Sequence, residues 1–159
     1  GEEYASALLF PMERLFQDYV AKEIRNVLSP RGWYVSAQES ALYLFDNPRK
    51  FKLRPDIVVR KGEKTYILDT KWKLLGNDPS QNYKISQSDM YQMYAYYKKY
   101  EAKKERVKGV YMLYPKTENL SAIPNHCSDD GVNVKIRFID LLQSERAFID
   151  FCGNVENNT

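Results

Sequence analysis

The chain has 159 residues, an ordinary length for one domain, and 43% of them are hydrophobic, so it can bury a core and is not expected to be disordered. Its 24 Lys and Arg residues against 21 Asp and Glu residues give a formal net charge of +3, which permits a polyanionic partner without requiring one. Two cysteines, with no Cys-x-x-Cys or Cys/His cluster, argue against a disulfide scaffold and a structural zinc site.

The N-terminal sequence GEEYASALLF is acidic with only a short apolar patch, unlike a signal peptide. No apolar run approaches the length that spans a membrane, so we expect no membrane partner. The low cysteine content favours a reducing, cytoplasmic setting. Because the chain starts at Gly1 rather than at an initiator methionine, we expect residues 1–159 to be a single domain from a longer chain.

A long helix and a strand region are predicted first. Apolar residues recur at helical spacing over 11–28, Pro11 suits the first turn of a helix, and Ser-Pro-Arg-Gly at 29–32 ends it. Residues 33–46 are typical of two strands or of one bent ribbon, and Asn47-Pro48 indicates a turn.

Two neighbouring strands are predicted at 53–60 and 64–73, because the short break between them suits a hairpin. After a polar loop, a helix is predicted at 88–104, with Ser88 or Asp89 as its cap and lysines in its last turns.

Further strands are predicted at 106–115 and 132–141, and a short helix at 142–153. The order of these elements predicts a mixed α/β domain with a central sheet flanked by helices.

Each strand of the expected hairpin has one aspartate within its apolar run: Asp56 in LRPDIVVR and Asp69 in YILDTKWK. Residues two apart on a strand share a face, so Asp69 and Lys71 point the same way, and pairing can place Asp56 beside Asp69. Two carboxylates that close repel each other unless a cation lies between them, and their oxygens suit Mg²⁺. The alternative is a surface salt bridge, because Asp-x-Lys and Pro-Asp are both common.

Three residues on the predicted helices are further candidates. Glu13 falls on the apolar face of the first helix, where a carboxylate is unfavourable without a charged partner, although the helix dipole also favours a glutamate in a first turn. Gln92 and Tyr96 are one helical turn apart and share a face. Alternatively, Tyr96 belongs to the core and Gln92 to the solvated surface.

Lysines interleaved with aromatic residues lie on or after these elements: Lys71, Lys73, Lys84, Lys98, Lys99, Lys103 and Lys104, with Trp72, Tyr83 and Tyr97. They predict either a rim that binds phosphates or an ordinary solvated surface, and the pattern favours neither.

RPDIVVR followed by YILDTKWK resembles the PD-(D/E)xK motif of nucleases, with Pro55-Asp56 and Asp69-Thr70-Lys71 at the motif positions. QMYAY, at 92–96, is similar to the QxxxY element beside that motif in RecB-like nucleases. FPMERLFQDYV and SDMYQMYAYYKKY resemble specifically the nuclease domain of the McrC family, the cleaving subunits of McrBC modification-dependent restriction systems. The resemblance extends from about residue 10 to about residue 115.

This resemblance implies a restriction-endonuclease-like fold and hydrolysis of double-stranded DNA that depends on Mg²⁺, with Mn²⁺ as a substitute. Asp56, Asp69 and the backbone carbonyl of Thr70 are the implied metal ligands. Glu13 is implied to contact the metal directly or through water.

The other candidates take supporting roles by the same resemblance. Lys71 is implied to position the attacking water, and Gln92 to orient groups of the site or the phosphate, with Tyr96 packed alongside. Apart from the resemblance, the lysines interleaved with aromatic residues give three expected contacts with DNA: Lys73, Lys84 and Tyr83.

McrC proteins engage a GTP-driven McrB ring through an N-terminal region that is absent or truncated here, so an McrB-like AAA+ GTPase is the expected partner of a full-length chain. The sequence has no GxxxxGK[ST] motif of its own. A RecB-like exonuclease, a junction resolvase and a catalytically inactive DNA-binding module stay open as alternatives. The iron–sulfur form of the RecB-like enzymes is excluded, because it needs four cysteines.

Overall fold

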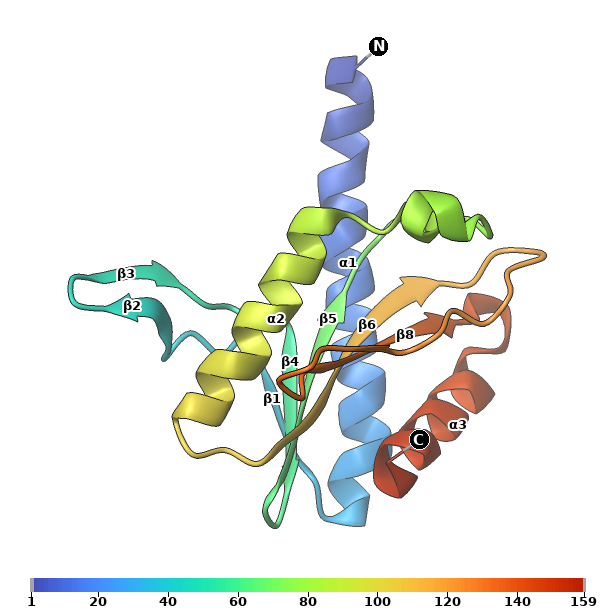
Figure 1. Cartoon of the computed structure of the whole chain (residues 1–159). Helices are drawn as coiled ribbons and strands as arrows, with labels where there is room; N and C mark the ends of the chain where they lie inside the picture. The colour runs from blue at the N-terminus through green and yellow to red at the C-terminus, as the bar shows by residue number, and fades with distance from the viewer. Residues whose placement is uncertain (1, 159) are drawn as a thin grey trace.

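A computed structural model describes residues 2–158, with the backbone alone for residues 4–10 and 144. Over these residues the fold has three α-helices, with a run of strands between the first and the second and another between the second and the third (Figure 1). In chain order they are α1 (Glu2–Leu28), β1 (Tyr34–Ala37), β2 (Tyr43–Asp46), β3 (Arg49–Lys52), β4 (Ile57–Lys61), β5 (Lys64–Thr70), α2 (Gln87–Ala102), β6 (Val107–Pro115), β7 (His126–Cys127), β8 (Asn133–Ile139) and α3 (Ser144–Asn157).

Six of these strands form one mixed sheet in the order β1-β4-β5-β6-β8-β7. The neighbours β1, β4 and β5 are antiparallel, whereas β5, β6 and β8 run parallel and β7 returns antiparallel to β8. β2 and β3 pair only with each other, in a separate two-stranded hairpin. The parallel pair β5 and β6 is connected through α2, so the end of β5 and the start of α2 lie close together.

Helices cover both faces of the sheet (Figure 1). On one face, α1 and α3 pack against side chains such as Ile57 and Leu68. On the other face, α2 packs against Val58 and Ile67. Successive residues of a strand point to opposite faces, which explains why these uninterrupted apolar strands supply both cores.

The turn between β4 and β5 is short, because Gly62 takes a φ of 58°, which side chains other than glycine rarely adopt. This turn fixes the register of the pair, with Ile57 opposite Leu68. The register determines which residues meet at the far end of the two strands.

Several element boundaries differ from those predicted. α1 begins at Glu2 and contains Pro11, because residues 2–10 are rich in the helix-forming residues Glu, Ala and Leu and the helix continues through the proline. α2 is capped by Ser86, whose hydroxyl accepts a hydrogen bond from the Asp89 amide, rather than by Ser88 or Asp89. β3 and β7 were not expected, and α3 extends to Asn157.

The prediction of a mixed sheet flanked by helices is confirmed, and the arrangement is that of a restriction-endonuclease-like fold. None of the helices within residues 2–158 combines the length and the hydropathy needed to cross a membrane.

Candidate active site

The two aspartates lie side by side at one end of the sheet. Asp56 immediately precedes β4, and the register of β4 with β5 places it opposite Asp69. Both have the strand parity of Val58 and Ile67, which puts them on the face covered by α2. Asp69 is only 3% exposed, and Asp56 is partly buried.

Asp56 is held by donors from two neighbouring strands. Its Oδ2 accepts hydrogen bonds from the Thr70 backbone amide at 2.7 Å and from the Thr70 hydroxyl at 2.8 Å. Its Oδ1 accepts one from Gln38 Nε2 at 3.3 Å. These three donors fix the position of the carboxylate at the mouth of the site.

Asp69 and Lys71 form a close pair in a buried setting. The distance from Lys71 Nζ to Asp69 Oδ2 is 2.9 Å. Burial, together with repulsion from Asp56, raises the pKa of Asp69 to about 7 against the attraction of Lys71. A carboxyl group held at this pKa has a strong affinity for an added positive charge.

Lys71 is surrounded by acceptors. Its ammonium lies 3.4 Å from Asp89 Oδ1 and donates to Gln92 Oε1 at 3.3 Å, in addition to its pair with Asp69. Burial by itself lowers the pKa of Lys71, but attraction to Asp69, Asp89 and Asp56 outweighs it and raises that pKa above its ordinary value. Lys71 is therefore a cation at neutral pH.

One face of α2 completes this arrangement. Gln92 Nε2 donates to the Tyr96 hydroxyl at 2.8 Å, and Tyr96 is buried. Burial, followed by the nearby Asp69 and Asp56, raises the pKa of Tyr96 well above its usual range, so the phenol stays protonated. The candidates Asp56, Asp69, Lys71, Gln92 and Tyr96 therefore belong to a single connected site.

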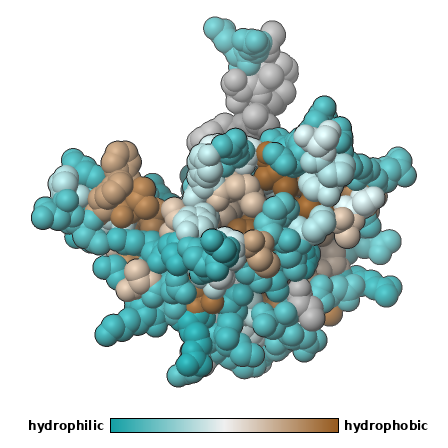
Figure 2. Space-filling view, in the orientation of Figure 1, coloured by the Kyte–Doolittle hydropathy of each residue, from teal (hydrophilic) through white to brown (hydrophobic). Residues whose placement is uncertain are grey.

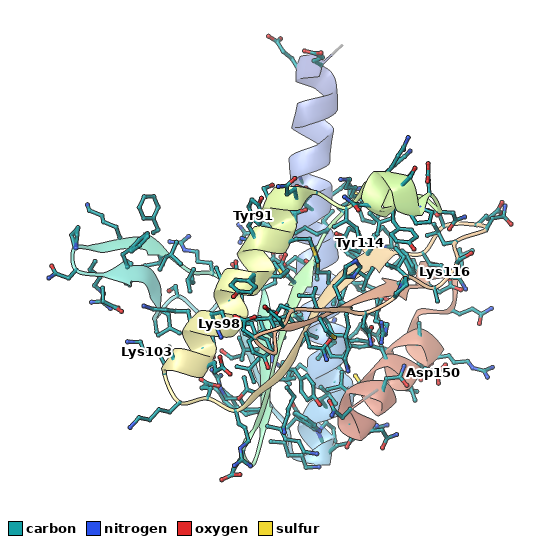
Figure 3. The ribbon with its side chains drawn as sticks, viewed as in Figure 1. Tyr91, Lys98, Lys103, Tyr114, Lys116 and Asp150 are labelled. Atoms are coloured by element: carbon teal, nitrogen blue, oxygen red, sulfur yellow. The ribbon has the colours of Figure 1, made fainter. Side chains whose placement is uncertain are left out.

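Three residues of this site were missed in the sequence. Asp89 lies three residues before Gln92 and seven before Tyr96, so all three share one face of the helix. This spacing could have identified Asp89 as a residue of the site. Gln38 directly follows β1, and no pattern along the chain links it to Asp56. Tyr114 on β6, labelled in Figure 3, is buried near the carboxylates, and burial followed by Asp89 and Asp69 raises its pKa above the ordinary range.

Glu13 lies outside this cluster. Its side chain is exposed on α1, so the expected burial without a charged partner does not arise. It lines a shallow cavity of about 220 Å³ with Gln17 and Gln38. Since Gln38 donates to Asp56, Glu13 borders the site through this neighbour.

The predicted lysine rim is not one surface. On α2, Lys98 pairs with Glu101 and Asp130, and Lys99 pairs with Asp46. Lys103, directly after α2, also pairs with Asp46, so these cations have carboxylate partners (Lys98 and Lys103 are labelled in Figure 3). Lys73 and Lys84 are exposed in the loop between β5 and α2, and Tyr83 is partly buried there. Lys73, Lys84 and Tyr83 thus stay candidates for contact with DNA, at the same end of β5 as Asp69.

The donor set fits Mg²⁺ better than a closed transition-metal site. Within residues 2–158, no three side chains of His, Cys, Asp or Glu gather into a group that could hold a metal by themselves. Mg²⁺ usually keeps several waters and needs only one or two carboxylates. Asp56, Asp69 and the Thr70 carbonyl can supply that set, and a cation between the carboxylates relieves the repulsion that raises the pKa of Asp69.

Replacing Asp56 by alanine is expected to lower the free energy of unfolding by roughly 1–3 kcal/mol, because the amide and hydroxyl of Thr70 lose their acceptor. Urea denaturation at pH 5 isolates this effect, since Asp69 is then largely neutral and the repulsion between the two aspartates is weak. Asp56→Asn keeps an oxygen acceptor and should be less destabilised. An alanine variant as stable as the wild type would contradict this account of Asp56.

The geometry agrees with a comparison of the whole sequence with protein families. No curated protein matches the chain. The family model described as McrBC 5-methylcytosine restriction system component matches residues 1–115, which include α1, the two aspartates, Lys71 and all of α2. The chain therefore belongs to the McrBC 5-methylcytosine restriction system component family.

Proposed function

We propose that this chain is the DNA-cleaving component of a McrBC-type restriction system, a Mg²⁺-dependent endonuclease. The observation that supports it best is the pair Asp56 and Asp69, two carboxylates on adjacent strands with a charged lysine 2.9 Å from the buried one. The alternative is a surface salt bridge, which does not require a carboxylate such as Asp69 to be only 3% exposed and next to a second carboxylate.

Asp56, Asp69 and the Thr70 carbonyl would hold the cation. A divalent cation bound there supplies Lewis-acid polarisation of a phosphate oxygen and neutralises negative charge in the transition state. The Thr70 amide and hydroxyl and Gln38 keep the Asp56 carboxylate in one orientation beside Asp69.

Lys71 remains charged, so its proposed role is to orient a reacting group and not to accept a proton. Asp69 at 2.9 Å and Gln92 at 3.3 Å hold the ammonium in a fixed position. If its longest contact, 3.4 Å to Asp89, opens on binding DNA, the third N–H can hold a water or a phosphate oxygen. Gln92 is in turn fixed by Tyr96, which is anchored in the core.

The proposed partners are double-stranded DNA and an McrB-like GTPase of the AAA+ class. Membership of the McrBC family supports a partner within the restriction system. The GTPase would drive or license cleavage in the assembled system, because this chain has no nucleotide-binding motif of the GxxxxGK[ST] type.

Cleavage of supercoiled plasmid tests this function. We expect slow nicking and linearisation by the isolated chain in Mg²⁺ or Mn²⁺, DNA binding without turnover in Ca²⁺, and loss of all cleavage in EDTA. Undiminished cleavage in EDTA would refute the metal-dependent mechanism. Degradation of linear but not of circular DNA would favour the exonuclease alternative, and binding without cleavage in Mg²⁺, with or without the GTPase, would favour an inactive DNA-binding module.

A further inference from the structure

The β2–β3 hairpin is set apart from the rest of the fold. It forms its own two-stranded sheet and projects away from the six-stranded sheet, beside α2 (Figure 1). Its base is closed by a hydrogen bond of 2.8 Å from the Leu53 amide to the Leu42 carbonyl. Leu53 is buried in the apolar cluster under α2, so the base is fixed while the two strands extend into solvent.

Apolar side chains are displayed on this projection rather than buried. Phe45 is 55% exposed and Phe51 is 70% exposed, and their rings pack edge-on with centroids 5.9 Å apart. Phe51 has a φ of 60°, a conformation that bulky side chains rarely adopt. Figure 2 shows the apolar surface of the hairpin bordered by hydrophilic residues. An ordinary solvated hairpin needs neither aromatic ring at such a position.

Basic groups flank this aromatic pair. Arg49, Lys50 and Lys52 are exposed, and none of them forms an ion pair with another residue in the described part of the chain. Arg49 lies 4.4 Å and Lys52 5.4 Å from the centroid of the Tyr43 ring, which supports both side chains.

The single acidic residue of the hairpin, Asp46, is the cross-strand partner of Arg49 and also pairs with lysines of the body of the protein. Asp46 Oδ2 lies 2.6 Å from Lys99 Nζ and 3.9 Å from Lys103 Nζ, so α2 neutralises it and ties the hairpin to the body of the protein. The hairpin is left with two lysines, Lys50 and Lys52, that have no acidic partner among residues 2–158, together with the exposed Arg49 and two aromatic rings. This combination is complementary to a polyanion with apolar surface in its grooves, which is the chemistry of duplex DNA.

The hairpin is also close enough to the carboxylates to touch the same DNA molecule. Lys52 is four residues before Asp56, so at about 3.3 Å per extended residue it lies within about 13 Å of it. Successive phosphates of one strand are about 3.4 Å apart along the helix axis. Lys52 therefore lies within about four base pairs of a phosphate bound at the carboxylates, and Lys50 and Arg49 are two and three residues further along the hairpin.

We propose that the β2–β3 hairpin is a second DNA contact of this chain, in which Lys50, Lys52 and Arg49 bind phosphates and Phe45 and Phe51 rest against the sugars and base edges of a groove. This inference rests on the proposed function, because it takes DNA as the partner. It assigns the grip on DNA to a surface distinct from the lysines that follow β5.

Two double variants separate the two kinds of contact. Lys50→Gln/Lys52→Gln should lower the slope of log affinity against log salt by about two, one for each lost phosphate contact. Phe45→Ser/Phe51→Ser should weaken binding about tenfold or more with an unchanged slope, because it removes an uncharged contact. Both are measured by fluorescence anisotropy of a short labelled duplex in Ca²⁺, with the 159-residue chain.

Matched controls come from exposed positions far from the hairpin. Lys22→Gln/Lys64→Gln removes two exposed lysines, on α1 and at the start of β5, and Leu142→Ser/Ile149→Ser removes two exposed apolar side chains near and on α3. Both control variants should bind DNA as the wild type does. Thermal denaturation of every variant establishes that it is folded.

The results distinguish the inference from the proposed function. If the wild type cleaves DNA and the hairpin variants bind DNA as the controls do, the inference about the hairpin is wrong and the proposed nuclease function stands. If the wild type does not cleave DNA in Mg²⁺ but the hairpin variants bind DNA more weakly than the wild type, the nuclease function is wrong and the inference about the hairpin stands. If the hairpin variants instead change the sedimentation of the protein alone and leave DNA affinity unchanged, the hairpin is a protein contact and the inference is wrong.

Discussion

Asp69→Asn is expected to stabilise the metal-free protein at pH 8 by up to about 4 kcal/mol and to abolish its cleavage of DNA. Asp69 has an ordinary pKa of 3.8, and burial beside Asp56 raises it to about 7 in the folded protein. That separation corresponds to about 4 kcal/mol at a pH above both values. Asparagine has nearly the same shape and no charge to desolvate, so the variant avoids this destabilisation while losing a proposed metal ligand.

The pH dependence has a definite sign. Below about pH 4 the carboxyl is protonated in both the folded and the unfolded state, so the charge of Asp69 affects neither. Between about pH 4 and pH 7 the unfolded chain has released a proton that the folded protein keeps, so the stability of the wild type falls as pH rises. The advantage of Asp69→Asn should therefore be small near pH 4 and complete above pH 7.

Urea denaturation at pH 4 and pH 8, with and without Mg²⁺, measures this effect. Mg²⁺ should stabilise the wild type at pH 8 and leave the asparagine variant nearly unchanged, because binding to the folded state requires the carboxylate. Asp150→Asn, at an exposed aspartate of α3, serves as the control and should show neither behaviour. A gain of equal size at both pH values would mean that charge desolvation at Asp69 is not its cause.

Local patterns in the sequence sufficed for the centre of the site. Asp56, Asp69 and Lys71 belong to two adjacent strands joined by a short turn at Gly62, so alternation along each strand and one register determine which side chains meet. The spacing of Gln92 and Tyr96 placed them on one face in the same way. These placements depend only on residues that are close together in the sequence, so they could be predicted from it.

Contacts between distant segments were not predictable. Gln38 reaches Asp56 from the position directly after β1, and Asp89 reaches Lys71 only because α2 packs across this end of the sheet. Glu13 was expected on a buried stripe, yet α1 packs through Phe16 and Val20 and leaves it exposed. β3 has the sequence RKFK, which lacks an apolar alternation, and it is a strand because β2 pairs with it.

Lys71→Arg is expected to reduce cleavage by about a hundredfold or more while leaving DNA binding in Ca²⁺ nearly unchanged. The ammonium has three donors, and the structure gives it three acceptors: Asp69, Asp89 and Gln92, at 2.9, 3.4 and 3.3 Å. A planar guanidinium keeps the charge but is larger and presents its donors in a different geometry. It therefore displaces the group that the ammonium would orient.

The raised pKa of Lys71 narrows its role further. A lysine that surrounding carboxylates keep protonated is a poor proton acceptor, so its contribution must come from position and charge. If charge alone mattered, arginine would serve nearly as well. Loss of cleavage in Lys71→Arg together with intact binding therefore isolates the contribution of position.

Lys99→Arg is the matched control, because Lys99 is likewise a partly buried lysine that pairs with a carboxylate, 2.6 Å from Asp46, but it lies far along α2 from the aspartates. It should cleave at nearly the wild-type rate. Single-turnover cleavage of plasmid, with affinity measured separately in Ca²⁺, compares the two variants directly. Near-normal cleavage by Lys71→Arg would reduce Lys71 to a source of positive charge, and the orientation of the attacking water would then have to come from another group of the site.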